Sequence, residues 1–262
     1  MLLTEQYFSK SYLYGCRPHV NVVFMKTHKT GSTCIQNIFL RYSDSHDLLI
    51  AVPITNGYFG HPDLFRRQFV PKLKANISYN MIASHMRFNY EELKAMMSLN
   101  TKFVTILRHP NTLFESVYSY YNLKLLFNVT YDDFLKYLYT NTTNGKNIRI
   151  NSRLHQRFGR NQMSFDLGLN VTQFENNITI NKFIDKLEKH FDLVLINERM
   201  DESLILLRQE LCWTLNDVIV FKLNARKDYI KQKRFVMIPF LVLFPKVPYI
   251  PFSLGIQRQS IS

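Results

Sequence analysis

The sequence is short of cysteine, with three residues that stand far apart at Cys16, Cys34 and Cys212. No CxxC pair occurs, which argues against a thiolate zinc site. The three thiols allow one disulfide and one free cysteine, and we predict the pairing Cys16–Cys212. We expect Cys34 to lie in a helix and to pack there as a small apolar residue.

Long hydrophobic runs are also missing. Residues 1–14 are too short and too polar for a signal peptide or a membrane anchor. Near the other end, the apolar run Phe235–Phe244 is interrupted by Pro239 and is too short to span a bilayer. We therefore expect no membrane anchor within the chain as given.

Acidic residues are few, with 20 Asp and Glu against 33 Lys and Arg, for a net charge of +13. This balance favours anionic partners, although a solvated basic surface without a specific partner explains it equally well. The basic residues are scattered and form no long run, so we expect no nucleic-acid partner. Five Asn-X-Ser/Thr triplets favour the lumen of the secretory pathway; they begin at Asn76, Asn128, Asn141, Asn170 and Asn177.

Short apolar runs alternate with helix-like patterns, which predicts an α/β fold with a central parallel sheet flanked by helices. The expected strands are Asn21–Met25, Met81–Ala83, Lys102–Leu107 and Phe191–Ile196. The expected helices are Thr33–Tyr42, Tyr90–Met97, Asn111–Leu126 and Asp201–Leu211. Residues 140–179 are rich in Asn and Thr, and we expect long surface loops with short helices there.

The segment Lys26–Thr33 joins the first expected strand to the first expected helix. Backbone N–H groups and the helix dipole converge at such a turn and attract phosphate. Gly31 permits close approach of the backbone, and Lys29 adds positive charge. The Walker pattern is absent because Lys29 precedes the only glycine. An ordinary strand-to-helix turn with a good N-cap is the alternative interpretation.

Two further groups follow expected strands. Arg108 ends one strand and Ser116 lies in the next helix, a pair that suits a second phosphate, although a surface ion pair is the plainer role for an isolated arginine. His85 follows another strand and can act as a general base, although most lone histidines are structural. Sites in open α/β sheets lie at the carboxyl ends of the strands, so we expect Lys29, His85 and Arg108 around one cleft.

Four stretches of the chain resemble the galactose 3-O-sulfotransferases, namely Asn21–Phe39, Ser84–Tyr90, Phe103–Tyr120 and Phe191–Arg226. The most specific are the Lys-Thr-His-Lys-Thr motif at 26–30 and the Phe-Lys-Leu-Asn-Ala-Arg segment at 221–226. The resemblance implies a P-loop-type sulfotransferase fold. It also implies that the 5′-phosphosulfate is bound by Lys29, Thr30, Gly31, Ser32 and Thr33, and the 3′-phosphate by Arg108 and Ser116.

The resemblance implies a metal-independent transfer of a sulfuryl group from 3′-phosphoadenosine-5′-phosphosulfate to the 3-hydroxyl of a β-galactose. The acceptor would be a glycolipid of the galactosylceramide type or a glycoprotein glycan. His85 would take the proton, Lys29 would neutralise charge on the leaving phosphate, and His28 would help either task. Family members are single-pass type II proteins of the Golgi membrane, so membrane association is expected although this chain shows no anchor.

The chain also departs from the family pattern. Gly31 stands where alanine is frequent, which a phosphate loop tolerates, and His109 stands where aspartate is usual. We expect an N-terminal remnant at 1–19, a sulfotransferase domain at 20–228 that is shortened at its C-terminal end, and a proline-rich apolar tail at 229–262. A truncated pseudoenzyme that binds a nucleotide or a glycan is the alternative function. A P-loop kinase or NTPase is disfavoured by the missing Walker lysine. The acceptor, and the choice between His28 and His85 as base, remain open.

Overall fold

The computed structural model describes residues 15–54, 57–75, 77–128, 130–133, 161–173 and 176–220. Within these ranges, six strands form one sheet in the order β2-β4-β1-β5-β6, with β3 paired to β4 as well. Every strand pairing is parallel. The strands are β1 (Val22–Lys26), β2 (Ile50–Ala51), β3 (Tyr58–Leu64), β4 (Met81–Arg87), β5 (Lys102–Leu107) and β6 (Leu193–Ile196).

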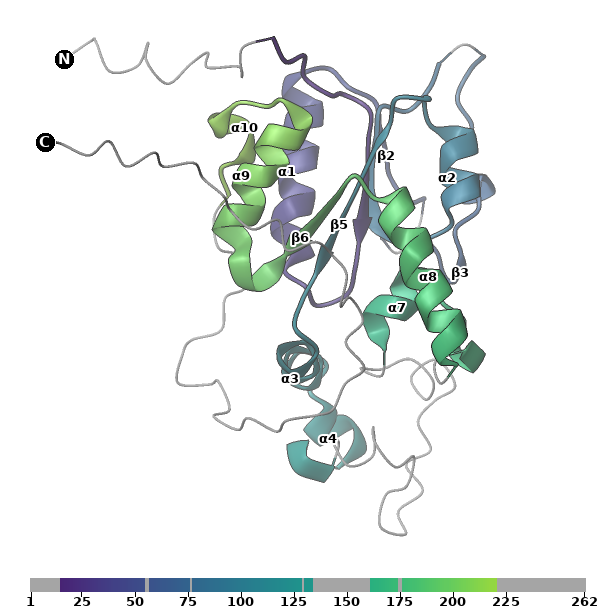
Figure 1. Cartoon of the computed structure of the whole chain (residues 1–262), viewed down its shortest axis with the longest axis vertical. Helices are drawn as coiled ribbons and strands as arrows, with labels where there is room; N and C mark the ends of the chain where they lie inside the picture. The colour runs from purple at the N-terminus through teal and green to yellow at the C-terminus, as the bar shows by residue number, and fades with distance from the viewer. Residues whose placement is uncertain are drawn as a thin grey trace, which may run out of the picture.

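Helices cover both faces of this sheet, as Figure 1 shows. One face carries α1 (Ser32–Ser45), α9 (Met200–Leu211) and α10 (Leu215–Val218), and the other carries α2 (Tyr90–Met96), α7 (Gln162–Asp166) and α8 (Asn177–His190). Neighbouring residues of β1 alternate between the two cores, since Phe24 packs on the α1 side and Met25 on the α2 side. The predicted α/β architecture with a central parallel sheet is confirmed.

The helix that follows β5 differs from the prediction. The sequence predicts one helix from Asn111 to Leu126, but the structure contains α3 (Pro110–Tyr120) and a separate α4 (Leu123–Phe127). Asn122 lies between them in the left-handed conformation, with φ 48°. A residue with this backbone geometry cannot continue a right-handed helix, so the apolar pattern continues across a break in the helix.

Short 3₁₀ turns are η1 (Arg67–Phe69), η2 (Val171–Gln173) and η3 (Asn197–Arg199).

The sequence predicts long surface loops with short helices over residues 140–179. In the part that the structure describes, α7 and η2 are such short helices, but the surface location is wrong for α7. All five residues of α7 are buried, and α8 begins at Asn177 inside the range. The buried α7 accepts hydrogen bonds from the end of β4, since the backbone N–H of Phe88, directly after β4, donates to the carbonyl oxygen of Asp166. Composition predicted exposure because Asn and Thr dominate the whole window, whereas every residue of this short helix, the polar ones included, is buried. Residues 134–160 lie outside the described residues.

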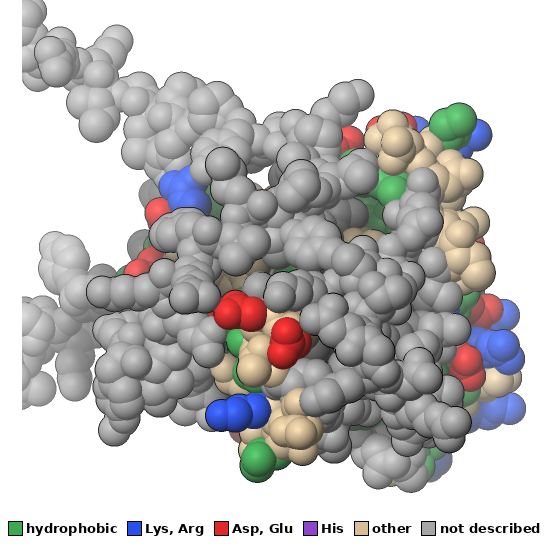
Figure 2. Space-filling view, turned by 90° about the horizontal axis from the view of Figure 1, so that it is seen from below, with side chains coloured by type: hydrophobic (Ala, Val, Ile, Leu, Met, Phe, Trp, Pro, Cys, Tyr) green, Lys and Arg blue, Asp and Glu red, His purple; other side chains and the backbone are tan. Residues whose placement is uncertain are grey.

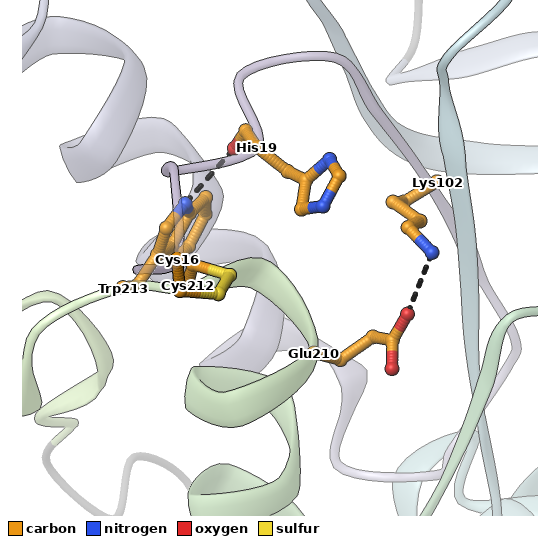
Figure 3. The surroundings of a disulfide bond; sticks show 6 residues. All are labelled: Cys16, His19, Lys102, Glu210, Cys212 and Trp213. Carbon is orange, nitrogen blue, oxygen red and sulfur yellow. Dashed lines mark hydrogen bonds and ion pairs between the residues drawn. A yellow bond between two sulfur atoms is a disulfide. The ribbon is translucent and has the colours of Figure 1, made fainter. Parts of the chain in front are cut away.

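The predicted disulfide Cys16–Cys212 is confirmed, and Cys34 is half-buried in α1 and lies outside this disulfide. Figure 3 shows the disulfide beside Trp213, whose indole N–H donates to the carbonyl oxygen of His19 at 2.9 Å. The bond therefore fastens the segment before β1 to the end of α9. In the same view Lys102, at the start of β5, pairs with Glu210.

The surface seen from the carboxyl ends of the strands carries basic and acidic side chains interspersed, where the structure describes it (Figure 2). Among the described helices, none is both long and apolar enough to cross a membrane. The expected tail at 229–262, the segment 221–226 and the triplet asparagines Asn76 and Asn141 lie outside the described residues.

Candidate active site

Sheet pairing brings the predicted site residues to one edge. Lys26 at the end of β1 pairs with His85 near the end of β4, and Tyr58 of β3 pairs with His85 from the other side. β5 lies next to β1 and ends at Leu107, so Arg108 leaves the sheet at the same edge. The loop after β1 therefore meets His85 and Arg108 at the carboxyl ends of three adjacent strands.

The loop after β1 is held by its own hydroxyl groups. The Thr27 hydroxyl lies 2.8 Å from that of Thr30 and donates to the carbonyl oxygen of Ile106 at 2.6 Å. The Ser32 hydroxyl donates to the carbonyl oxygen of Thr27 at 2.7 Å. Thr30 and Ser32 are buried and shape the loop with their side chains, so their expected contact with a phosphate would come from the backbone. Thr33 is exposed in the first turn of α1.

The start of α1 has the features of an anion site. Its N-cap is Gly31, in the left-handed conformation at φ 75°, so the N-cap residue makes no side-chain hydrogen bond to the first turn. The ordinary capped turn, which the sequence left open, is therefore not what the structure contains. The first N–H groups of a helix have no partner within the helix, and together with the helix dipole they favour phosphate. A Cβ on Gly31 would lie 2.3 Å from Oδ1 of Asn197, so this position has little room for a side chain.

Lys29 and Arg108 meet directly. Lys29 has a left-handed backbone, with φ 59°, and its carbonyl oxygen accepts from Nη1 of Arg108 at 2.9 Å. Nε of Arg108 donates to the Thr112 hydroxyl at 3.0 Å. The ammonium of Lys29 lies 3.4 Å from the centre of the Tyr120 ring, a cation–π contact. A strained backbone held by an arginine is the kind of arrangement that concentrates at functional sites.

The first turn of α3 lies beside this pair. His109, where the family usually has aspartate, is the N-cap of α3, and its Nδ1 accepts from the Asn111 N–H at 3.3 Å. A ring nitrogen thus does what an aspartate oxygen does at this position, so the substitution leaves the cap in place. Glu198 accepts from the N–H of His109 and the Thr112 hydroxyl, both at 3.0 Å. Ser116 lies further along α3 and is half-buried.

His85 and His28 stack on each other, with ring centres 4.2 Å apart and an angle of 19° between the planes. Nδ1 of His85 lies 2.9 Å from the carbonyl oxygen of Lys26, which can only accept, so this nitrogen carries the hydrogen. Burial, followed by the charges of His28 and Lys26, lowers the pKa of His85 to about 3. Tyr58 stacks on the same pair and is partly exposed.

Asp166 of α7 belongs to this site, and no sequence pattern pointed to it. Its side chain is fully buried. Oδ2 accepts from the backbone N–H of His28 at 2.8 Å and lies 2.9 Å from Nδ1 of His28, while Oδ1 accepts from Gln162 at 2.9 Å. An acidic residue between Phe165 and Leu167 was the available signal, because an acid inside an apolar stretch needs a buried partner.

Asp166 and His28 shift each other's pKa. Burial alone would lower the pKa of His28, but the charge and hydrogen bond of Asp166 outweigh it and raise the pKa above its ordinary value. Burial alone would raise the pKa of Asp166, but the charge and hydrogen bonds of His28 hold it well below its usual range. Asp166 is therefore an ionised carboxylate at neutral pH, and it favours a protonated His28.

Lys26 places a second cation beneath the loop. Its ammonium donates to Gln36 of α1 at 2.5 Å, and Gln36 donates in turn to the carbonyl oxygen of Ala83 at 2.6 Å. Burial lowers the pKa of Lys26 to about 8. The sequence placed Lys26 in the motif but assigned it no role; the structure shows a buried amine held against the start of α1.

His28, His61 and Asp166 bring donor atoms within 4.8 Å of one another, which is close enough to surround a metal ion. Nε2 of His61 is buried without a hydrogen bond, and it lies 3.7 Å from Oδ1 of Asp166. However, both oxygens of Asp166 already accept N–H groups, and the charges of Lys26 and Lys29 act on His28. This setting disfavours a cation, and we interpret the group as a hydrogen-bonded carboxylate–histidine cluster.

Comparison with known proteins agrees with this geometry. The model of the galactose-3-O-sulfotransferase family matches residues 3–236. Galactosylceramide sulfotransferase from Mus musculus is 37% identical over 216 residues, which cover 82% of this chain and 50% of the mouse protein. Galactose-3-O-sulfotransferase 3 from Homo sapiens is 36% identical over 217 residues, covering 79% of this chain and 48% of the human protein.

A third relative, galactose-3-O-sulfotransferase 2 from Mus musculus, is 36% identical over 233 residues, covering 80% of this chain and 54% of that protein. The chain thus spans about half the length of the curated relatives it matches. The matched part includes the loop after β1, both stacked histidines, Arg108 and Asp166. The chain belongs to the galactose-3-O-sulfotransferase family.

Proposed function

We propose that this protein is a galactose 3-O-sulfotransferase, which moves a sulfuryl group from 3′-phosphoadenosine-5′-phosphosulfate to the 3-hydroxyl of a β-galactose. One observation carries the proposal. At a single sheet edge, a helix N-terminus without a side-chain cap lies next to two cations and two stacked histidines, in a chain of this family. This arrangement combines an anion site with groups that can accept a proton.

The donor side of the site is the loop from Lys29 to Thr33. The 5′-phosphosulfate would lie at the start of α1, where the backbone N–H groups and the helix dipole favour negative charge. Lys29 leaves Tyr120 to contact this group, because a cation–π contact is weaker than a charge-assisted hydrogen bond to phosphate. Arg108, which contacts the loop from the end of β5, and Ser116 of α3 bind the 3′-phosphate.

The reaction is an in-line displacement at sulfur. The galactose 3-oxygen forms a bond to sulfur while the bond from sulfur to the phosphate oxygen breaks, and 3′-phosphoadenosine-5′-phosphate leaves. The proton of the hydroxyl passes to one of the stacked histidines, and the negative charge that develops on the leaving phosphate is met by Lys29 and the helix N-terminus. Lys26 adds positive potential from below the loop. The side chains alone account for each step, so transfer needs no metal.

The acceptor side faces Tyr58. Its ring stacks beside both histidines and is partly exposed, so it offers an aromatic face on which the C–H face of galactose packs. The names of the matched relatives give galactosylceramide and galactose as what those proteins act on, and we expect a galactose-containing glycolipid or glycan as the acceptor here. We place the protein in the Golgi lumen, at the membrane. The disulfide Cys16–Cys212 supports an oxidising compartment, and so do exposed triplet asparagines such as Asn170 and Asn177.

The experiment incubates the purified chain with ³⁵S-labelled donor and a panel of β-galactosides, including galactosylceramide. The expected product carries the label on the 3-oxygen, and a matched acceptor with a 3-O-methyl group remains unlabelled. EDTA leaves the rate unchanged. Tight donor binding without transfer to any acceptor would overturn the proposal and identify an inactive donor-binding protein.

A further inference from the structure

The buried carboxylate of Asp166 stands behind the stacked histidines and contacts only one of them. It reaches His28 across 138 residues of sequence, through α7, which is buried along its whole length. A buried carboxylate without compensating donors is strongly unfavourable, and here the donors come from His28 and Gln162. Burial of the Asp166 carboxylate costs free energy, and this carboxylate lies directly behind the loop that we propose binds the donor. This placement points to a functional role for Asp166.

The contact fixes which nitrogen of His28 carries the hydrogen. An ionised carboxylate only accepts hydrogen bonds, so Nδ1 of His28, 2.9 Å from Oδ2, must be the donor. The second contact, from the backbone N–H of His28 to the same oxygen at 2.8 Å, fixes the position of the ring relative to the carboxylate. In the neutral imidazole the lone pair then lies on Nε2, on the side of the ring away from Asp166.

We propose that Asp166 is the positioning residue that makes His28, rather than His85, the base that takes the proton from the acceptor hydroxyl. The proposal rests on the proposed function and names the group that performs one of its steps. Asp166 holds the Nδ1–H tautomer, orients the ring, and stabilises the imidazolium that forms when Nε2 receives the proton. It touches neither substrate, so it acts only through His28.

His85 lacks this support. Its Nδ1 bonds the neutral carbonyl oxygen of Lys26, and no carboxylate contacts its ring among the interactions of the described residues. A carbonyl sets the tautomer but gives an imidazolium far less stabilisation than an ionised carboxylate does. Burial lowers the pKa of His85 to about 3, which agrees with poor stabilisation of its imidazolium, since such a ring does not retain a proton at neutral pH. His85 therefore supports His28 by stacking against it.

Some of the groups around His28 raise its pKa and others lower it. Lys26 and Lys29, from the end of β1 and the loop, oppose the charged form, while Asp166 from α7 favours it. The remaining neighbours are His85 of β4 and, from β3, the rings of Tyr58 and His61. The carboxylate prevails, because the pKa of His28 lies above its ordinary value. A base must be unprotonated to act, so transfer rises with pH through the pKa of His28.

Asp166→Asn tests the proposal. The amide can donate to Nδ1, which moves the hydrogen to Nε2 and removes the lone pair from the reacting side. We expect kcat to fall about 10²- to 10⁴-fold, as for loss of a general base, with donor affinity nearly unchanged. The acidic limb of the kcat/KM profile should move to lower pH. The double variant with His28→Ala should be no slower than His28→Ala alone, because residues that act as one unit are not additive.

Asp192→Asn is the matched control. Asp192 also accepts a backbone N–H, from Phe103 at 2.7 Å, and pairs with Lys102, but it lies at the opposite edge of the sheet. The same chemical change there should leave kcat and the pH profile unchanged. A folded Asp166→Asn with wild-type kcat and an unmoved acidic limb would overturn the proposal. Wild-type protein that labels no acceptor would instead overturn the proposed function.

A measurement on the unaltered protein covers the case in which Asp166→Asn fails to fold. ¹⁵N NMR of histidine side chains, with the His28 signals identified from their absence in His28→Gln, distinguishes the two tautomers directly. We expect hydrogen on Nδ1 of His28 and a pKa above 6.5. In the neutral ring, measured above the pKa of His28, hydrogen on Nε2 instead of Nδ1 would overturn the proposal whatever the activity of the protein, and so would a pKa below 6.5.

Discussion

Arg108 donates through Nη1 to the carbonyl oxygen of Lys29 at 2.9 Å, so the arginine assigned to one phosphate also braces the loop assigned to the other. The bond lies where the backbone of Lys29 is left-handed, at φ 59°. Such a backbone persists only when its surroundings hold it. The two halves of the proposed donor site are therefore joined by a hydrogen bond, and a substitution in one half should affect the other.

Replacing Arg108 with alanine should weaken donor binding by about 2–3 kcal/mol, the scale of a lost charge-assisted contact. With a donor analogue that lacks the 3′-phosphate, the loss of binding free energy should shrink to about 1 kcal/mol, because only the hydrogen bond from Arg108 to the Lys29 carbonyl is then lost. Isothermal titration with both ligands measures the difference. Thr112→Val, which removes the contact to Nε together with the hydroxyl's own bonds to His109 and Glu198 but leaves the guanidinium in place, serves as the control and should change affinity little. Equal losses with both ligands would show that Arg108 does not bind the 3′-phosphate.

Gly31→Ala should destabilise the protein by about 1–2 kcal/mol, because a side chain is unfavourable at φ 75°. It should also weaken donor binding, since the new Cβ would lie 2.3 Å from Oδ1 of Asn197 and one of them must move. We expected a phosphate loop to tolerate either glycine or alanine at position 31, but the closeness of Asn197 makes alanine less favourable in this chain. Gly57→Ala is the control, with φ 69° and nothing within 4 Å of its Cβ. Urea unfolding measures the stability of both variants, and donor titration should show weaker binding only for Gly31→Ala. Equal donor affinity in Gly31→Ala and Gly57→Ala would contradict the expectation.

The contribution of His28 to stability should depend on pH. Its pKa is raised in the folded state, so the stabilisation is fully present below the ordinary value of 6.5 and is lost as the pH rises through the folded pKa. The difference in unfolding free energy between wild type and His28→Gln should therefore shrink above neutrality, by about 1.4 kcal/mol for each unit of pKa shift. Urea titrations from pH 5 to 9 measure it, with the exposed His46→Gln as control. A difference that grows with pH would contradict the assignment of the charged pair.

Reducing the Cys16–Cys212 bond should lower the free energy of unfolding by about 2–5 kcal/mol, the usual range for a native disulfide. The bond joins residues 196 apart, so its loss frees a long loop in the unfolded chain. Thermal melts with and without dithiothreitol measure the effect. Cys34→Ser should respond to the reductant as the wild type does, whereas Cys16→Ser should no longer respond. An unchanged melting temperature on reduction would refute the role of the bond.

The sequence alone determined the parallel α/β sheet, because strands buried on both faces and helices with one apolar face leave strong local patterns. It also located the loop at 26–33, the residues His85 and Arg108, and the cysteine pair. It missed β3, since Gly60, His61 and Pro62 interrupt any strand pattern, and it ran α3 into α4 because Asn122 breaks the backbone without breaking the apolar spacing.

Only the tertiary structure decided how the two histidines differ. In the sequence, His28 and His85 each follow an expected strand and look alike. Folding places His85 inside β4, and it puts Asp166 behind His28 but the carbonyl oxygen of Lys26 behind His85. Asp166 lies 138 residues from His28, so no local pattern could join them. A buried carboxylate and a backbone carbonyl have opposite consequences for an imidazolium, and packing between distant segments determines which histidine receives which neighbour.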